Sequence, residues 1–184
     1  MCVLRTLDTL SDMDKKYSRK IAMILHEGSK VRTTLQILTH TGTAFFWLTI
    51  IPIWYFFFDG DQRALTLGFI TGFMLLPVFA LKQTVRRPRP DYKDTRLGAV
   101  LMDKWSFPSG HATRSTYVVI VLGNFYPHLI LLWLIWALIM ISSRLLLGVH
   151  YISDILAGIL ISIVFMVFFW IIGWLPLVPF HLSF

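Results

Sequence analysis

The stretch RSTYVVIVLGNFYPHLILLWLIWALIMISSR, residues 114–144, has no Asp, Glu, Lys or Arg between its two terminal arginines. A helix that crosses the apolar core of a bilayer needs roughly 20 apolar residues. This stretch is therefore long enough for two short membrane-spanning helices. The polar and proline-containing segment 124–128 marks a turn in its middle. We predict two helices, over 108–126 and 128–147.

The rest of the chain has the same apolar character. Apolar residues make up 56% of the 184 residues and charged residues 15%, and the mean hydropathy is +0.67. Such a composition is typical of membrane proteins rather than soluble domains. Further uncharged runs predict spans at 42–58, 64–82 and 151–173. The expected fold is an all-α, polytopic membrane helix bundle with about five transmembrane helices.

The first forty residues differ from this pattern. Apolar side chains alternate at helical spacing with the basic residues Lys15, Lys16, Arg19 and Lys20. Such a helix lies more readily on a membrane surface than across the bilayer, and no apolar core follows to make it a cleavable signal peptide. We therefore expect a single domain, 1–184, with an N-terminal interfacial segment at 1–41 and a transmembrane core at 42–173.

The basic residues are distributed unevenly. Of 17 Lys and Arg residues, only Arg63 falls on the membrane side that carries the predicted turns 59–63 and 124–128. The positive-inside rule would place the opposite, basic side in the cytoplasm. Because several of these bases also suit catalysis, the orientation stays open. We expect an integral protein of the cell inner membrane or endoplasmic reticulum, with the bilayer as partner and no nucleic acid.

Three polar stretches end on that basic side. They are KQTVRRPRP at 82–90, PSGH at 108–111 and SRLLLGVHYISD at 143–154. Each lies at the end of a predicted span, where charged residues are costly and usually functional. The convergence predicts one functional site at this face of the membrane.

The pair His150 and Asp154 has the spacing of neighbours on one helix face. The carboxylate can fix the tautomer of the imidazole and leave its other nitrogen as a nucleophile. An interfacial pair that only packs is the alternative for these two residues taken alone.

The other two stretches favour phosphate binding. Five basic residues are expected together at this face of the membrane, and they are Lys82, Arg86, Arg87, Arg89 and Arg144. Arginine forks and lysines suit phosphate oxygens, although anchoring to lipid headgroups is an alternative for all but Arg144, which lies inside an apolar span. Pro108 suits a first helical turn, and Ser109 and Gly110 would offer backbone N–H groups at a helix N-terminus. His111 can then protonate a leaving oxygen.

The three stretches together resemble the signature of the type 2 phosphatidic acid phosphatase superfamily. The matching pattern is Lys82-x6-Arg89-Pro90, then Pro108-Ser109-Gly110-His111, then Ser143-Arg144-x5-His150-x3-Asp154. The resemblance covers about residues 64–173. Many members of this superfamily have six spans, and here a surface helix takes the place of the first.

The resemblance implies the chemistry of a phosphohistidine. His150 attacks phosphorus, Asp154 orients His150, and His111 gives a proton to the departing oxygen and then helps to activate water. No metal or other cofactor is implied, and the sequence has no carboxylate cluster near the site like those that bind magnesium.

The resemblance also implies a set of phosphate-binding residues, namely Lys82, Arg89, Ser109, Gly110 and Arg144. Arg86 and Arg87 fall outside the motif positions. They either contact a second phosphate or the lipid headgroup, or they are surface charges.

The expected function is a metal-independent membrane phosphatase that removes the terminal phosphate of a lipid phosphate or isoprenoid diphosphate. Within the superfamily, DKWSFPSGHATRS and TVRRPRP are similar to small polyisoprenoid and presqualene diphosphate phosphatases. They also overlap with bacterial phosphatases of phosphatidylglycerophosphate or undecaprenyl diphosphate. A lipid phosphotransferase with the same intermediate and a non-catalytic anion or lipid transporter are the alternative functions.

Overall fold

The computed structural model describes residues 2–90 and 104–174, with side chains from Thr9 onward. Within these ranges all regular elements are helices and no strand occurs. The helices are α1 (Cys2–Ala22), α2 (Lys30–Leu38), η1 (Thr39–Gly42), α3 (Ala44–Phe57), α4 (Gln62–Val85), α5 (Gly110–Phe125), η2 (Pro127–Leu129), α6 (Ile130–Leu146) and α7 (Ile152–Ile171). The prediction of an all-helical fold is confirmed.

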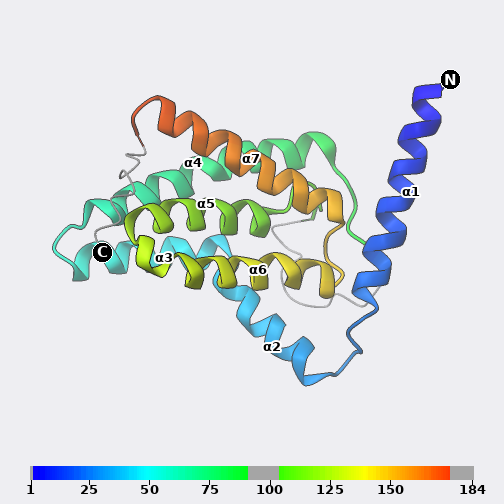
Figure 1. Ribbon diagram of the computed structural model, residues 1–184, viewed down its shortest axis with the longest axis horizontal. Helices are drawn as coiled ribbons and strands as arrows, with labels where there is room; N and C mark the ends of the chain where they lie inside the picture. Colours follow the sequence, from blue (N-terminus) through cyan, green and yellow to red (C-terminus); the bar gives the residue numbers. More distant parts are fainter. Residues whose placement is uncertain (1, 91–103, 175–184) are drawn as a thin grey trace.

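Helices α3 to α7 coincide with the five predicted spans, and their ends differ from the predicted ends by at most three residues. The predicted turn at 124–128 overlaps the 3-10 helix η2, where Pro127 interrupts the helical run. The turns after α3 and α5 lie at one end of the bundle, and the α6–α7 turn lies at the other (Figure 1). This is the arrangement that the alternation of spans predicts.

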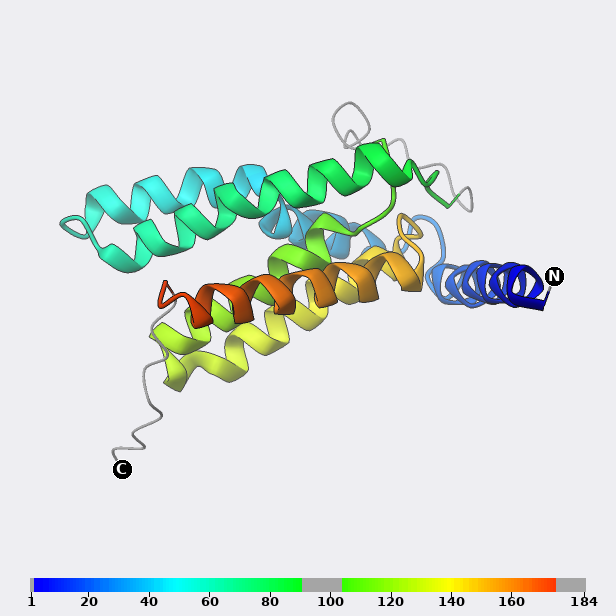
Figure 2. The ribbon, with the colours of Figure 1, turned by 90° about the horizontal axis from the view of Figure 1, so that it is seen from above.

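The bundle has two layers, with α3 and α4 in one and α5, α6 and α7 in the other (Figure 2). Helix α5 packs along both α6 and α7, and α3 packs along α4. Apolar side chains such as Leu67, Ile70 and Val118 fill the space between the layers. The bundle thereby holds the N-terminal end of α5 next to the ends of its neighbours.

Helix α5 is the central element, and its composition follows from that position. It buries polar residues such as Thr113, Arg114 and Ser115 as well as apolar ones. These groups are shielded from lipid because α4, α6 and α7 surround them, and polar groups at membrane depth are placed inside bundles for this reason.

Three helical segments are long and apolar enough to cross a membrane, namely α4, η2 with α6, and α7. A fourth crossing is possible where α2 with η1 and α3 form one segment that is bent by 54°. Large apolar side chains such as Phe45, Leu76 and Leu131 are exposed on the outer faces of these helices, as lipid contact requires. The chain is therefore an integral membrane protein, while the count of five spans stays a prediction.

Helix α1 lies outside the bundle. It runs across the bundle end where α4 stops and α7 begins, rather than along the bundle axis (Figures 1 and 2). Its inward face carries Ser18 and Ala22, both buried, while Leu10 and Tyr17 are exposed. The predicted N-terminal helix is thus present, and its place on the membrane surface stays a prediction.

Gly158 permits the close contact between α5 and α7. A Cβ atom at this position would lie 2.7 Å from the carbonyl oxygen of Ser109 and 3.0 Å from Oγ1 of Thr113. We expect Gly158→Ala to force the two helices apart and to lower the free energy of unfolding by about 1–3 kcal/mol. Thermal unfolding in detergent micelles measures this change.

Gly72 is the matched control, because it is also a helical glycine but a Cβ there would meet nothing within 4 Å. Gly72→Ala is expected to leave stability within about 0.5 kcal/mol of the unsubstituted protein. Equal effects of the two substitutions would contradict the assigned role of Gly158.

Candidate active site

Three segments that are far apart in the sequence meet at the end of the bundle where α4 stops and α5 and α7 start (Figure 1). The backbone N–H of Ser106 donates to the carbonyl oxygen of Arg87 at 2.9 Å, and that of Ser109 donates to the carbonyl oxygen of Asp154 at 2.9 Å. Backbone hydrogen bonds thus join the three polar stretches whose convergence the sequence predicts.

His150 and Asp154 are fully buried beside each other, with 1% and 0% of their surface exposed. They do not share one helix as the spacing suggested, because His150 precedes α7 and Asp154 lies in its first turn. Oδ2 of Asp154 accepts the backbone N–H of Tyr151 at 2.9 Å, which turns the carboxylate back toward the imidazole. Nδ1 of His150 lies 3.5 Å from Oδ2, longer than a usual hydrogen bond.

Arg89 contacts the opposite nitrogen of the same imidazole. Its Nη1 donates to the carbonyl oxygen of Val149 at 2.9 Å and lies 3.2 Å from Nε2 of His150. A guanidinium only donates hydrogen bonds, so Nε2 carries the lone pair and Nδ1 carries the proton that faces Asp154. This is the tautomer that a nucleophilic Nε2 requires.

His111 lies in the first turn of α5, on the same end of the bundle. Its Nε2 is 3.2 Å from the carbonyl oxygen of Thr39, and because a carbonyl only accepts, Nε2 carries a proton. His111 lies at the start of α5 and His150 immediately precedes α7, so the two histidines lie at the same end of the bundle (Figure 1).

Arg144 and Ser143 reach this region from the last turn of α6, where both are buried. Nη1 of Arg144 donates to Oγ1 of Thr39 at 3.1 Å, and Oγ of Ser143 lies 3.2 Å from the same oxygen. The guanidinium of Arg144 is thus held beside His111 although it lies in an otherwise apolar helix.

The PSGH turn departs from its expected geometry in two respects. Pro108 precedes the first turn of α5, because Ser109 is the N-cap and Gly110 is the first helical residue. The N–H of Ser109 is already donated to Asp154, so it does not serve as a phosphate donor in this arrangement. Its hydroxyl accepts the N–H of Ala112 at 3.4 Å and thereby caps the helix.

The charge balance of the site favours an anion. Lys82 is buried at the end of α4, where its Nζ donates to the carbonyl oxygen of Trp105 at 2.9 Å. Together with Arg89 and Arg144 it brings positive charge to the end of the bundle that holds both histidines. Within the part of the chain that the structure describes, no three His, Cys, Asp or Glu side chains come together as metal ligands.

The sequence of residues 63–176, more than half of the chain, matches the family model of the PAP2 superfamily. The chain belongs to the PAP2 superfamily. This confirms the resemblance that the three polar stretches indicate.

Curated and solved PAP2 proteins are similar to the chain. It is 37% identical over 79 residues to decaprenylphosphoryl-5-phosphoribose phosphatase of Mycobacterium tuberculosis, covering 43% of this chain and 44% of that one. It is 30% identical over 135 residues to phosphatidylglycerophosphatase B of Bacillus subtilis, covering 66% and 64%.

The chain also resembles the crystal structure of a transmembrane PAP2-type phosphatidylglycerolphosphate phosphatase from Bacillus subtilis, with a TM-score of 0.66, 25% identity, and 90% and 85% of the two chains covered. The alignment to the mycobacterial relative spans less than half of that protein's length. The shared features are therefore the fold and the family.

The bent segment between α2 and α3 contributes to this PAP2 site, which the sequence did not predict. Thr39 contacts His111, Ser143 and Arg144, as described above, and the carbonyl oxygen of Gly42 accepts Nη1 of Arg114 at 2.7 Å. A Cβ at Gly42 would lie 2.9 Å from the imidazole of His111, so this position needs glycine. The triplet Thr41-Gly42-Thr43, a turn signal inside an uncharged run, was the available indication.

Arg87 lies at the candidate site, where the sequence predicts it among the basic residues, but its contacts were not predicted. Its Nη1 contacts Oδ1 of Asp154 at 2.7 Å, and its Nη2 contacts Oδ2 of Asp14 at 2.8 Å. The sequence left Arg87 as a ligand of a second phosphate or of the lipid headgroup, or as a surface charge, and the structure places it between two carboxylates. Arg86, by contrast, is exposed, and its Nε donates to the carbonyl oxygen of Gln83 at 2.7 Å.

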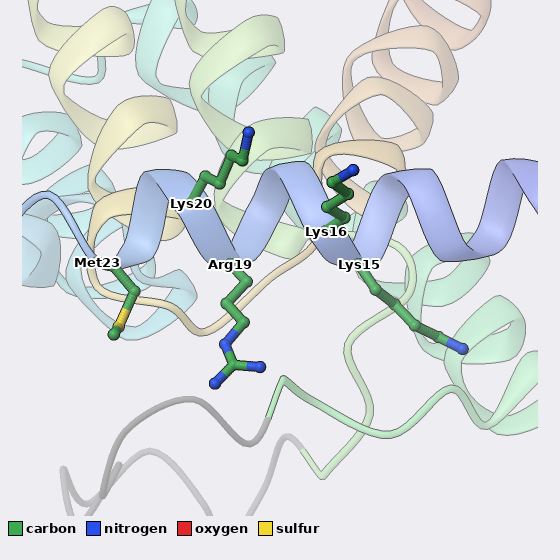
Figure 3. Close-up of a pocket in the computed structure, with 5 residues that line it drawn as sticks. All are labelled: Lys15, Lys16, Arg19, Lys20 and Met23. Carbon is green, nitrogen blue, oxygen red and sulfur yellow. The ribbon is translucent and has the colours of Figure 1, made fainter.

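The basic residues of α1 do not join the site. Figure 3 shows Lys16 and Lys20 on one side of the helix and Lys15 and Arg19 on the other. With Met23 they line a cavity of about 590 Å³ at the surface. The contribution of α1 to the site comes from its acidic residue Asp14 instead.

Proposed function

We propose that the protein is a metal-independent membrane phosphatase that hydrolyses the terminal phosphate of a lipid phosphate or isoprenoid diphosphate. The observation that carries this proposal is the position of the buried His150 between a cation and a carboxylate. Nη1 of Arg89 lies 3.2 Å from Nε2, and the buried carboxylate of Asp154 lies 3.5 Å from Nδ1, which favours the tautomer with the proton on Nδ1. A neutral imidazole oriented in this way is an activated nucleophile.

In the first step, Nε2 of His150 attacks phosphorus as the bond from phosphorus to the departing oxygen breaks. A phosphohistidine forms, and His111 acts as an imidazolium that transfers its Nδ1 proton to that oxygen and becomes neutral. The hydrogen bond from Nε2 to the carbonyl oxygen of Thr39 supports the assignment, since it orients the ring and leaves the other ring nitrogen for the departing oxygen. The products of the step are a lipid alcohol, or a lipid monophosphate when the substrate is a diphosphate, and the phosphoenzyme.

In the second step, water attacks the phosphohistidine, and the phosphorus–nitrogen bond breaks. His111 accepts the proton of the water, inorganic phosphate leaves, and both histidines return to their starting states. Lys82, Arg89 and Arg144 stabilise the charge on the equatorial oxygens in both steps. Gly110 lets the phosphate approach the N-terminal end of α5, with the capping Ser109 beside it.

An apolar cavity of about 510 Å³ between α3, α5 and α6 supports the proposal that the substrate has a lipid tail. Aromatic residues including Trp54 and Trp133 line it, and Thr41 and Met140 belong to its wall. Met140 lies 3.1 Å from the position of a Cβ at Gly42, which also borders the imidazole of His111. The tail of the substrate lies in this cavity while its phosphate reaches the histidines.

The membrane placement completes the proposal. Helices α3 to α7 cross the bilayer as five spans, with the site at one surface. Helix α1 lies in that surface, where its exposed side chains Leu10, Met13 and Tyr17 contact the lipid. The flanking basic residues of Figure 3 then face anionic headgroups.

The test uses purified protein and a panel of substrates: phosphatidate, phosphatidylglycerophosphate, and isoprenoid monophosphates and diphosphates. Released inorganic phosphate is measured with chelator, with added magnesium, and with vanadate. We expect release from at least one lipid to persist in chelator and to be inhibited by vanadate, which mimics five-coordinate phosphorus. A strict requirement for magnesium, or no release from any lipid, would overturn the proposal.

The same reactions separate the alternatives. A newly phosphorylated lipid without free phosphate indicates a phosphotransferase. Lipid or anion transport across liposomes without hydrolysis indicates a transporter.

A further inference from the structure

The carboxylate behind His150 is connected to α1 through an arginine. Arg87 bridges Asp154 and Asp14 at 2.7 and 2.8 Å. Asp154 has no exposed surface, and the side chains of Asp14 and Arg87 are 13% and 21% exposed. The three charges form one continuous chain from the N-terminal helix to the buried carboxylate.

Helix α1 also caps the start of α7. The first N–H groups of a helix have no partner within the helix. Here Oγ of Ser18 accepts the N–H of Ile152 at 3.0 Å, and Oδ1 of Asp14 accepts the N–H of Ser153 at 3.2 Å. The negative charge of Asp14 suits the positive end of the helix dipole. The cap fixes the turn in which Asp154 lies.

Arg87 is itself held from several directions. Its guanidinium stacks 3.9 Å from the ring centroid of Tyr151, and Nη1 also donates to Oγ of Ser153 at 2.6 Å. Burial acts to lower the pKa of Arg87, but the hydrogen bond to Asp14 and the charge of Asp154 outweigh burial and raise that pKa above its usual value. The guanidinium is thus a fixed cation.

We propose that Asp14 is a positioning residue of the phosphatase, which acts through Arg87 on Asp154 and so sets the orientation of His150. This inference rests on the proposed function. According to this inference, α1 contributes a positioning residue to the active site and also lies on the membrane surface. Asp14 holds one arm of the guanidinium, so the other arm stays directed at Oδ1 of Asp154 and leaves Oδ2 toward His150.

The test compares the kcat and KM of four single variants with those of the unsubstituted protein. Asp14→Asn keeps the shape and the acceptor for Ser153 but removes the charge facing Arg87. We expect kcat to fall roughly 10- to 100-fold, as when other residues that orient a catalytic group are replaced. KM stays unchanged, because Asp14 does not reach the substrate. Arg87→Lys keeps the charge but loses the planar guanidinium whose two nitrogens contact the two carboxylates, and it is expected to have a similar effect.

Two variants on α1 serve as controls. Asp12 is 78% exposed and pairs only with Lys15 among the described ion pairs, so Asp12→Asn should leave kcat unchanged. Ser18→Ala removes the cap on Ile152 but leaves the charge of Asp14 in place. It should lower the thermal unfolding temperature while reducing kcat far less than Asp14→Asn does.

The double variant Asp14→Asn with Arg87→Lys decides whether the two residues act as one unit. Residues in one network give losses that do not add, so kcat of the double variant should be close to that of the worse single variant. Additive losses, or equal losses of kcat in Ser18→Ala and Asp14→Asn, would overturn the proposal. If the unsubstituted protein releases no phosphate, the proposed function fails. If the unsubstituted protein is active and Asp14→Asn keeps its full kcat, this inference alone fails.

Discussion

Replacing His150 with alanine is expected to reduce phosphate release by about 10⁴-fold or more, as loss of a covalent nucleophile does in other hydrolases. The side chain is 1% exposed and provides the Nε2 lone pair that faces Arg89. Without it, water must attack the substrate directly, and no phosphohistidine forms. The measurement is steady-state turnover of the best lipid substrate, together with trapping of the phosphorylated protein by acid-sensitive, base-stable labelling.

His26→Ala is the matched control for this prediction. His26 is an exposed histidine between α1 and α2, and its loss should leave turnover unchanged. His150→Gln keeps much of the volume of the buried side chain and separates loss of chemistry from loss of folding. Near-normal turnover in a folded His150 variant would remove this residue from the mechanism.

His111→Gln is expected to reduce turnover of lipid monophosphates by about 10²- to 10⁴-fold, the usual contribution of a general acid. A glutamine keeps an N–H that can bond the carbonyl oxygen of Thr39, which His111 contacts at 3.2 Å, but it cannot deliver a proton. The effect should depend on the leaving group, because a lipid alkoxide needs that proton and a nitrophenolate does not.

The comparison is therefore between a lipid monophosphate and p-nitrophenyl phosphate, each tested with the unsubstituted protein and with His111→Gln. Formation of the phosphoenzyme from p-nitrophenyl phosphate should be nearly retained in the variant. Equal losses for both substrates would show that His111 does not protonate the leaving oxygen in the first step.

The bundle was largely predictable because lipid imposes a simple rule on sequence. A spanning helix must be long and uncharged, so the uncharged run between Arg114 and Arg144, interrupted by Pro127, predicted two helices whose ends lie within two residues of those observed. The role of the bent segment around η1 was harder to predict from the sequence. Its polar residues Thr39 and Thr41 resemble an interfacial stretch, and only contacts with α5 and α6 show that Thr39 is buried in the site.

The candidate site was predictable where a residue type has few uses near lipid. An arginine inside an apolar helix, such as Arg144, indicates function by its cost alone. Asp14 carries no such signal, because an acidic residue on a charged helix usually faces water. Its partners Arg87 and Ser153 are 73 and 139 positions away, and no helical periodicity connects them.

That separation along the chain has a consequence for biogenesis. Helix α1 precedes α3 to α6 in the chain, and α7, which carries Asp154 and accepts the cap from Asp14, follows them. A nascent chain that has been synthesised only through α6 still lacks His150, the carboxylate of Asp154 and the anchor of α1. The network that joins α1 to α7 therefore assembles only after α7 has been synthesised.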